Sequence, residues 1–257
     1  MTENNNNKPL IEIKSLDKQF GNIHAVRGIT FSINKGEVLG FLGPNGAGKS
    51  TTMKMVTGFL EPTSGTVIVG NHDIQDEPIK AKKKIGYLPE GAPLYGEMTV
   101  ISFLNFIADI RGMTGTYRDK RIEEVIEKIN LQSVRYQTLE TLSKGFKRRV
   151  GVAQAILHDP EILIMDEPTD GLDPNQKHEV RTLIQEMASE KAIIISTHIL
   201  EEVDAVCTRA IIIASGQLLF DGTPAELMSR SESGKLDDVF RQITTQHYEE
   251  KGVVAHS

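Results

Sequence analysis

A glycine-rich segment limits what this chain can fold into more than any other feature. Residues 43–51, GPNGAGKST, fit the pattern G-x-x-x-x-G-K-[ST]. The short run Val38–Leu42 before them is almost wholly apolar, as in a strand buried on both faces, and residues 51–59 after them have helical character. The sequence therefore predicts a buried strand, a glycine-rich loop and a helix in direct succession.

The residue types of this loop match the chemistry of phosphate binding. Small residues let backbone N–H groups turn inward around phosphate oxygens, and the following helix adds the partial positive charge of its N-terminus. Lys49 supplies a point charge to the β- and γ-phosphates, and the Ser50 hydroxyl ligates Mg²⁺. A plain helix-capping turn is disfavoured, because strand, loop, lysine and hydroxyl are all in place. We predict that ATP with Mg²⁺ binds to Gly43, Pro44, Asn45, Gly46, Ala47, Gly48, Lys49, Ser50 and Thr51.

Bulk properties argue against several other classes of protein. The formal net charge of −6 disfavours general nucleic-acid binding, which needs a basic surface. No apolar run approaches the roughly 20 residues of a membrane-spanning helix, and the Asn-rich residues 1–8 read as a disordered tail rather than a secretory signal. Cys207 is the only cysteine, and we expect a small buried hydrophobe rather than a reactive thiol. These features favour a soluble intracellular protein.

The rest of the chain reads as strands and helices in alternation. Residues 10–14, 29–33 and 66–69 have strand character, while residues 94–155 change to helical spacing and suggest a mostly helical insertion. We further expect strands at 161–165, 192–195 and 210–213, a hairpin strand at 217–220, and helices at 148–157, 176–189, 223–230 and 236–243. Alternation of this kind predicts a mostly parallel sheet covered on both faces.

An acidic pair is the second chemical signal. In EILIMDEP, residues 161–168, apolar residues precede Asp166 and Glu167, so Asp166 lies at the carboxyl end of a buried strand, where parallel sheets bind ligands. Asp166 could hold Mg²⁺ through water, and Glu167 could polarise the attacking water as a general base. Alone, such a pair reads as a solvated loop; beside the loop at 43–51 it indicates a catalytic site.

Three further segments place polar groups at the ends of predicted elements. LSKGF, residues 142–146, offers a hydroxyl and backbone N–H groups at a helix start, although alone it is only an N-cap. GLDP, residues 171–174, alone reads as a turn. STH, residues 196–198, follows a predicted strand. A single histidine is usually structural, but His198 at this position could reach a γ-phosphate or the attacking water.

Taken in their order along the chain, the five motifs resemble those of the ATP-binding subunit of an ABC (ATP-binding cassette) transporter. GPNGAGKST is similar to its Walker A motif, ILIMDEP to Walker B, LSKGF to the signature motif, GLDP to the D-loop and STH to the switch histidine. The likeness covers roughly residues 10–222. It also puts Phe20 where the family stacks an aromatic ring on adenine, with a strand-end core residue as the alternative.

The resemblance implies an α/β fold, with a P-loop NTPase core of the RecA-like type, an antiparallel β subdomain and a helical insertion. Residues 9–223 would form the ATPase domain, with the helical subdomain at about 93–157. Residues 224–257 would form a short helical extension. The resemblance also implies an enzyme that hydrolyses ATP to ADP and phosphate.

The family mechanism that this resemblance implies needs two subunits. Two cassettes would close head to tail on ATP, with Ser143 and the Gly145 backbone binding the γ-phosphate held by the partner. Hydrolysis by Glu167 with His198 would reopen the dimer. The motion would drive a separate transmembrane permease from the inner face of the cell membrane.

Two motifs depart from the family pattern. Lys144 and Phe146 replace a glycine and the glutamine of the usual LSGGQ signature. Glu90, in IGYLPE, takes the place of the Q-loop glutamine and could bind Mg²⁺ more tightly than an amide, so the predicted metal ligands are Ser50, Glu90 and Asp166. Both variants resemble the ABC-2 branch of drug, polysaccharide and gliding-motility exporters, which favours export.

Two other functions are alternatives to a transport ATPase. A non-transport ABC ATPase acting on ribosomes or DNA usually carries two cassettes in one chain or a long coiled-coil insertion, and neither is visible in this acidic sequence. A binding module that has lost catalysis is opposed by the intact Glu167 and His198.

Overall fold

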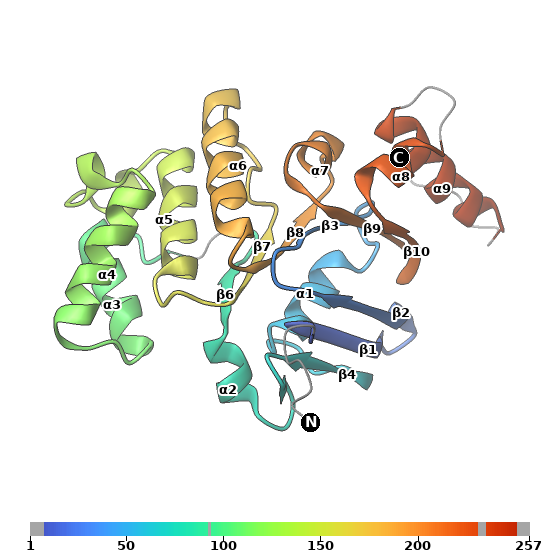
Figure 1. Ribbon diagram of the computed structural model, residues 1–257, viewed down its shortest axis with the longest axis horizontal. Helices are drawn as coiled ribbons and strands as arrows, with labels where there is room; N and C mark the ends of the chain where they lie inside the picture. Colours follow the sequence, from blue (N-terminus) through green and yellow to red (C-terminus); the bar gives the residue numbers. More distant parts are fainter. Residues whose placement is uncertain (1–7, 92–93, 231–234, 251–257) are drawn as a thin grey trace, which may run out of the picture.

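A six-stranded sheet forms the centre of the fold in the computed structural model, which describes residues 8–91, 94–230 and 235–250 (Figure 1). Its strand order is β10-β9-β3-β8-β7-β6, and all neighbours are parallel except the hairpin of β9 with β10. The strands are β3 (Val38–Leu42), β6 (Ile85–Leu88), β7 (Ile162–Asp166), β8 (Ala192–Thr197), β9 (Arg209–Ala214) and β10 (Gln217–Gly222). The predicted mostly parallel sheet is confirmed.

A second, antiparallel sheet lies beside the central one (Figure 1). It has the order β2-β1-β4-β5, and the register of its first pair runs from Ile11 opposite Ile33 to Phe20 opposite Ile23. Its strands are β1 (Ile11–Phe20), β2 (Ile23–Ile33), β4 (Ser64–Val69) and β5 (His72–Asp73). This sheet is the antiparallel subdomain that the family resemblance implied.

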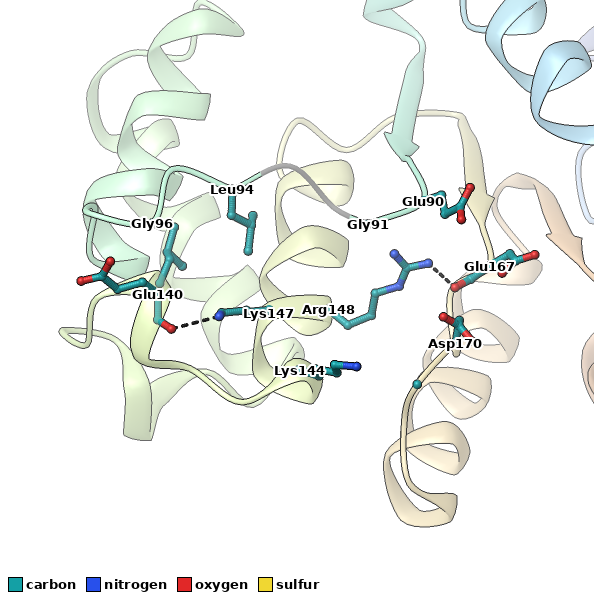
Figure 2. Close-up of a pocket in the computed structure, with 12 residues that line it drawn as sticks. Glu90, Gly91, Leu94, Gly96, Glu140, Lys144, Lys147, Arg148, Glu167 and Asp170 are labelled. Atoms are coloured by element: carbon teal, nitrogen blue, oxygen red, sulfur yellow. Dashed lines mark hydrogen bonds between the residues drawn. The ribbon is translucent and has the colours of Figure 1, made fainter.

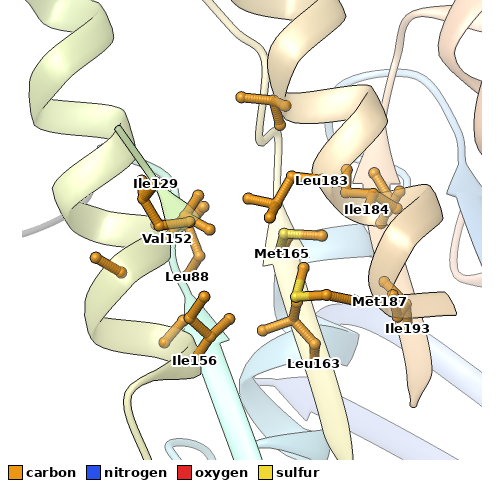
Figure 3. Packing of buried hydrophobic residues seen from close by; sticks show 14 of the residues in the cluster. Leu88, Ile129, Val152, Ile156, Leu163, Met165, Leu183, Ile184, Met187 and Ile193 are labelled. Carbon is orange, nitrogen blue, oxygen red and sulfur yellow. The ribbon is translucent and has the colours of Figure 1, made fainter. Parts of the chain in front are cut away.

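The two faces of the central sheet bury two separate hydrophobic clusters. Successive side chains of a strand point to opposite faces, so along β7 Ile162 and Ile164 join one cluster while Leu163 and Met165 join the other. The first cluster includes α1 (Lys49–Val56) and the antiparallel sheet. The second includes α5 (Lys144–Ile156) and α6 (Pro174–Ala188), whose side chains meet over β6 and β7 in Figure 3.

The predicted helical insertion consists of α3 (Val100–Ile110), α4 (Gly115–Lys128) and α5. Helix α5 begins at Lys144, one turn before the predicted start at residue 148, because the Ser143 hydroxyl accepts the Phe146 N–H and caps it. Strand β6 and helix α2 (Pro78–Lys83) were not predicted. A Cβ at Gly86 of β6 would lie 2.2 Å from the Ala155 carbonyl oxygen of α5, so a glycine is needed for this close packing.

The C-terminal part adds helices beside β9 and β10 (Figure 1). Helix α7 (Leu200–Val206) precedes β9, and α8 (Pro224–Met228) and α9 (Leu236–Glu250) follow the hairpin. Helix α9 extends seven residues beyond the predicted end at residue 243. The predicted tail at 1–8, apart from Lys8, lies outside the described residues. Among the helices that are described, none is long and apolar enough to cross a membrane.

Cys207 lies buried at the end of α7, against β3. A Cβ added at Gly40 would lie 3.0 Å from its sulfur. Burial raises the pKa of the Cys207 thiol to about 12. The thiol is therefore protonated at neutral pH and unreactive, as the sequence predicted.

Candidate active site

The glycine-rich loop is pressed against two strands. A Cβ at Gly43 would lie 2.3 Å from the Ile213 carbonyl oxygen, and one at Gly48 would lie 2.5 Å from the Ala25 carbonyl oxygen. Gly48 also has a φ of 106°, which side chains rarely permit. Because Gly48 is the N-cap of α1 and has no side chain, the first N–H groups of the helix are left for a ligand such as phosphate.

Lys49 holds its ammonium group inside this loop. Its side chain is only 7% exposed, and its Nζ donates to the carbonyl oxygens of Gly43 at 2.7 Å and Pro44 at 3.2 Å. Burial lowers the pKa of Lys49, while the carboxylates of Glu167, Asp166 and Glu90 oppose that shift. One buried cation thus lies within electrostatic range of three acids.

The carboxyl end of β7 positions the acidic pair. Asp166 is 3% exposed and lies opposite Ser196 in the parallel pairing of β7 with β8. Glu167 follows with a φ of 49°, a left-handed conformation that is uncommon for a residue with a side chain. Its N–H donates to the Ser196 carbonyl oxygen at 2.8 Å. This turn brings the Glu167 carboxylate out of the sheet, beside the glycine-rich loop.

His198 comes from the end of β8 and meets the same carboxylate. Its Nδ1 lies 3.0 Å from Glu167 Oε1, and its ring is half exposed. Two hydrogen bonds of Thr197 fix the turn that carries His198. The Thr197 hydroxyl donates to Glu202 Oε2 at 2.7 Å and accepts the Ile199 N–H at 3.0 Å. Burial raises the pKa of Glu202. Glu202 is not indicated by the sequence, because an acid in the first turn of a helix reads as a surface residue.

A polar cavity of about 310 Å³ joins most of the predicted site residues. The two acidic residues that line it, Glu90 and Glu167, also line a larger neighbouring cavity of about 560 Å³, shown in Figure 2. The smaller cavity is lined by Ala25, Asn45, Gly46, Gly48, Lys49, Ser50, Thr51, Glu90, Glu167 and His198.

Seven predicted residues do not line this cavity. Gly43, Pro44 and Ala47 belong to the glycine-rich loop itself and Asp166 ends β7, whereas Phe20, Ser143 and Gly145 lie elsewhere. Ser143 is exposed at the start of α5, and Gly145 is buried beneath the side chain of Gln176, which a Cβ would meet at 2.4 Å. Phe20 is 45% exposed at the end of β1, where Lys18 Nζ lies 5.1 Å from its ring centre. Phe20 is therefore not a core residue, and none of the three lines the 310 Å³ cavity.

The oxygen donors around Lys49 suit Mg²⁺. The ion prefers hard oxygen ligands and usually combines one or two protein groups with substrate phosphates and water. The described residues contain no cluster of three or more His, Cys, Asp or Glu that could hold a metal by itself. The Ser50 hydroxyl and the three carboxylates near Lys49 provide oxygen donors and an excess of negative charge. When bound, Mg²⁺ would supply charge neutralisation of the phosphates.

Comparison with known proteins shows the family to which this chain belongs. Residues 26–170 match the family model described as ABC transporter. The linearmycin resistance ATP-binding protein LnrL of Bacillus subtilis (strain 168) is 38% identical over 247 residues, which cover 96% of this chain and 78% of that protein.

Solved structures show the same fold. The structure of an ATP binding subunit of an ABC transporter superimposes with a TM-score of 0.83 at 28% identity, over 91% of this chain and 99% of that one. The dimeric structure of a bacterial ABC transporter cassette gives 0.76 at 25% identity, over 83% and 98%.

The fold and the cavity together define a P-loop ATPase that binds ATP with Mg²⁺. The chain belongs to the ABC transporter family, as an ATP-binding subunit.

Proposed function

We propose that this subunit hydrolyses ATP to power a separate membrane permease, and that the transporter works in export. The observation that carries the catalytic part is the 310 Å³ cavity, where Lys49, Glu167 and His198 converge on one space. Export is supported by the relative named for linearmycin resistance, because removing a compound from the cell is a direct route to resistance. The Glu90 and Lys144 variants of the family motifs point the same way.

In and around the cavity the predicted site residues have separate roles. Lys49 and the loop N–H groups would hold the β- and γ-phosphates, while Ser50 and Asp166, with Glu90 as a further oxygen donor, would hold Mg²⁺. Glu167 takes a proton from the attacking water, and His198, 3.0 Å from that carboxylate, orients it towards the γ-phosphate. Phe20, exposed at the end of β1, offers a face for adenine.

The cavity is half of the catalytic site. Ser143 and Gly145 belong to α5 and do not line it, so in our proposal they reach the phosphate of a second copy of the chain. The start of α5 suits this task, since an exposed hydroxyl and helix N-terminal N–H groups bind anions. A dimeric cassette among the similar structures supports this arrangement. The subunit would then act peripherally, on the inner face of the membrane.

Co-purification tests the transport role. Affinity-tagged chain in its native cell is expected to be recovered from detergent-solubilised membranes together with a protein that contains several membrane-spanning helices. An untagged strain, carried through the same purification, gives the background. Recovery from the soluble fraction with ribosomes or DNA and without a membrane protein would contradict the proposal and favour a non-transport ABC ATPase.

A further inference from the structure

Arg148 is a buried cation in the second turn of α5, and all its hydrogen bonds to described residues go to backbone carbonyls. Its side chain is 8% exposed. Nε donates to the Pro168 oxygen at 3.0 Å, Nη1 to the Pro89 oxygen at 3.2 Å, and Nη2 to the oxygens of Asp166 and Glu167. Figure 2 shows the guanidinium reaching from α5 to the main chain at Glu167. Burial lowers its pKa, but an arginine stays charged at neutral pH.

These four carbonyls belong to the two segments that carry the acids of the cavity. Asp166, Glu167 and Pro168 form the end of β7 and the turn after it, while Pro89 directly precedes Glu90. The helix that supplies the guanidinium is capped at its N-terminus by Ser143. The Arg148 side chain therefore connects α5 to the backbone of Glu167, the proposed catalytic base, and to the segment that carries Glu90.

The backbone of Glu167 requires this kind of support. Its φ of 49° costs free energy and persists only where the surroundings hold it. The Ser196 carbonyl holds the N–H of Glu167, and Arg148 holds its carbonyl oxygen. The peptide groups on both sides of Glu167 are thus fixed. The Cα atom from which the carboxylate side chain extends is therefore fixed as well.

We propose that Arg148 is a positioning residue that sets the place of the Glu167 carboxylate according to the position of α5. This inference rests on the proposed function, in which Glu167 is the base and the start of α5 binds the partner's nucleotide. A shift of α5 on closing against the partner's ATP would then move the base of its own subunit. Binding of ATP at one site would thus change the position of the catalytic base at the other site through the Arg148 guanidinium.

The test is Arg148→Lys, which keeps the charge but cannot span four carbonyls with a single ammonium group. Because a misplaced catalytic group costs up to about 100-fold, kcat for ATP should fall about 10- to 100-fold while KM stays within about twofold. Thermal unfolding establishes that the variant is folded. A merely structural residue would lower the unfolding temperature and leave kcat per folded enzyme unchanged.

Arg121→Lys is the matched control. Arg121 of α4 also donates to backbone carbonyls of α5 and the residue after it, Ile156 at 3.2 Å and Leu157 at 3.3 Å, but at the end far from the cavity. Its kcat is expected to stay within about twofold of the wild type.

A double-mutant cycle separates this inference from the proposed function. If Arg148 acts through Glu167, adding Arg148→Lys to Glu167→Gln should cause no further loss of turnover. The positioning role alone would be overturned if the losses of turnover in the two single variants multiply in the double variant. It would also be overturned if Arg148→Lys has the wild-type kcat while Glu167→Gln is inactive. Wild-type turnover by Glu167→Gln would overturn the base assignment and this inference with it.

Discussion

Replacing Glu167 by glutamine is expected to reduce ATP turnover about 10²- to 10⁴-fold, the usual range for the loss of a general base. The amide has nearly the shape of the carboxylate but cannot accept a proton from water. ATP binding should persist, because the phosphate contacts of Lys49 and the glycine-rich loop are left in place. Phosphate release measures the first effect, and equilibrium binding of a fluorescent ATP analogue measures the second.

Glu161→Gln is the control for this change. Glu161 directly precedes β7, at the opposite end of the strand from Glu167, and its carboxylate is paired with Lys84 at 2.7 Å. The same change of charge there should leave turnover within about twofold of the wild type. Equal turnover by Glu167→Gln and the wild type would show that another group takes the proton.

Replacing Lys49 by methionine is expected to weaken ATP binding strongly and to abolish turnover. The buried ammonium is the cation that the loop carbonyls of Gly43 and Pro44 direct into the cavity, and methionine keeps the length of the side chain without the charge. The acids Glu167, Asp166 and Glu90 would then meet the triphosphate without this compensation. Affinity for ATP should fall about 10- to 100-fold, as expected for one or two charge-assisted hydrogen bonds to phosphate.

Lys54→Met serves as the control for this second change. Lys54 lies in the same helix, α1, but is exposed in its last turn and does not line the cavity. Calorimetric titration with ATP should give wild-type affinity for Lys54→Met and strongly weakened binding for Lys49→Met. Equal affinities for the two variants would mean that the loop binds phosphate through its N–H groups alone.

Much of the site could be predicted because its residues are defined by local sequence. The loop at 43–51 and the acids after β7 each follow a buried strand, and parallel strands bring their carboxyl ends to one edge of a sheet. That geometry predicts that Lys49, Glu167 and His198 lie together, and all three line the 310 Å³ cavity. Strand β9, predicted at residues 210–213 and found at Arg209–Ala214, and the hairpin after it were equally readable from composition.

The contacts made through tertiary packing could not be predicted. Arg148 stood at the predicted start of a helix, where a basic residue reads as solvent-exposed. Only the folding of α5 onto β7 places its guanidinium against the carbonyls of Pro89 and Glu167. Strand β6 was missed for a related reason: it has four residues, with Gly86 among them, and it depends on packing against α5. No periodicity within its own sequence indicates it.

Light scattering after size exclusion tests most directly whether a second subunit completes the site. With Mg²⁺ and ATP, the Glu167→Gln variant should change from monomer to dimer. Adding Ser143→Asp should prevent this change without loss of ATP binding, because aspartate caps α5 as well as serine but repels the γ-phosphate of the partner's ATP.

Thr99→Asp, at the cap of α3, is the control and should dimerise normally. Completion of the site by a second subunit would be contradicted if Glu167→Gln binds ATP and stays monomeric. It would also be contradicted if the variant dimerises equally well with Ser143→Asp added.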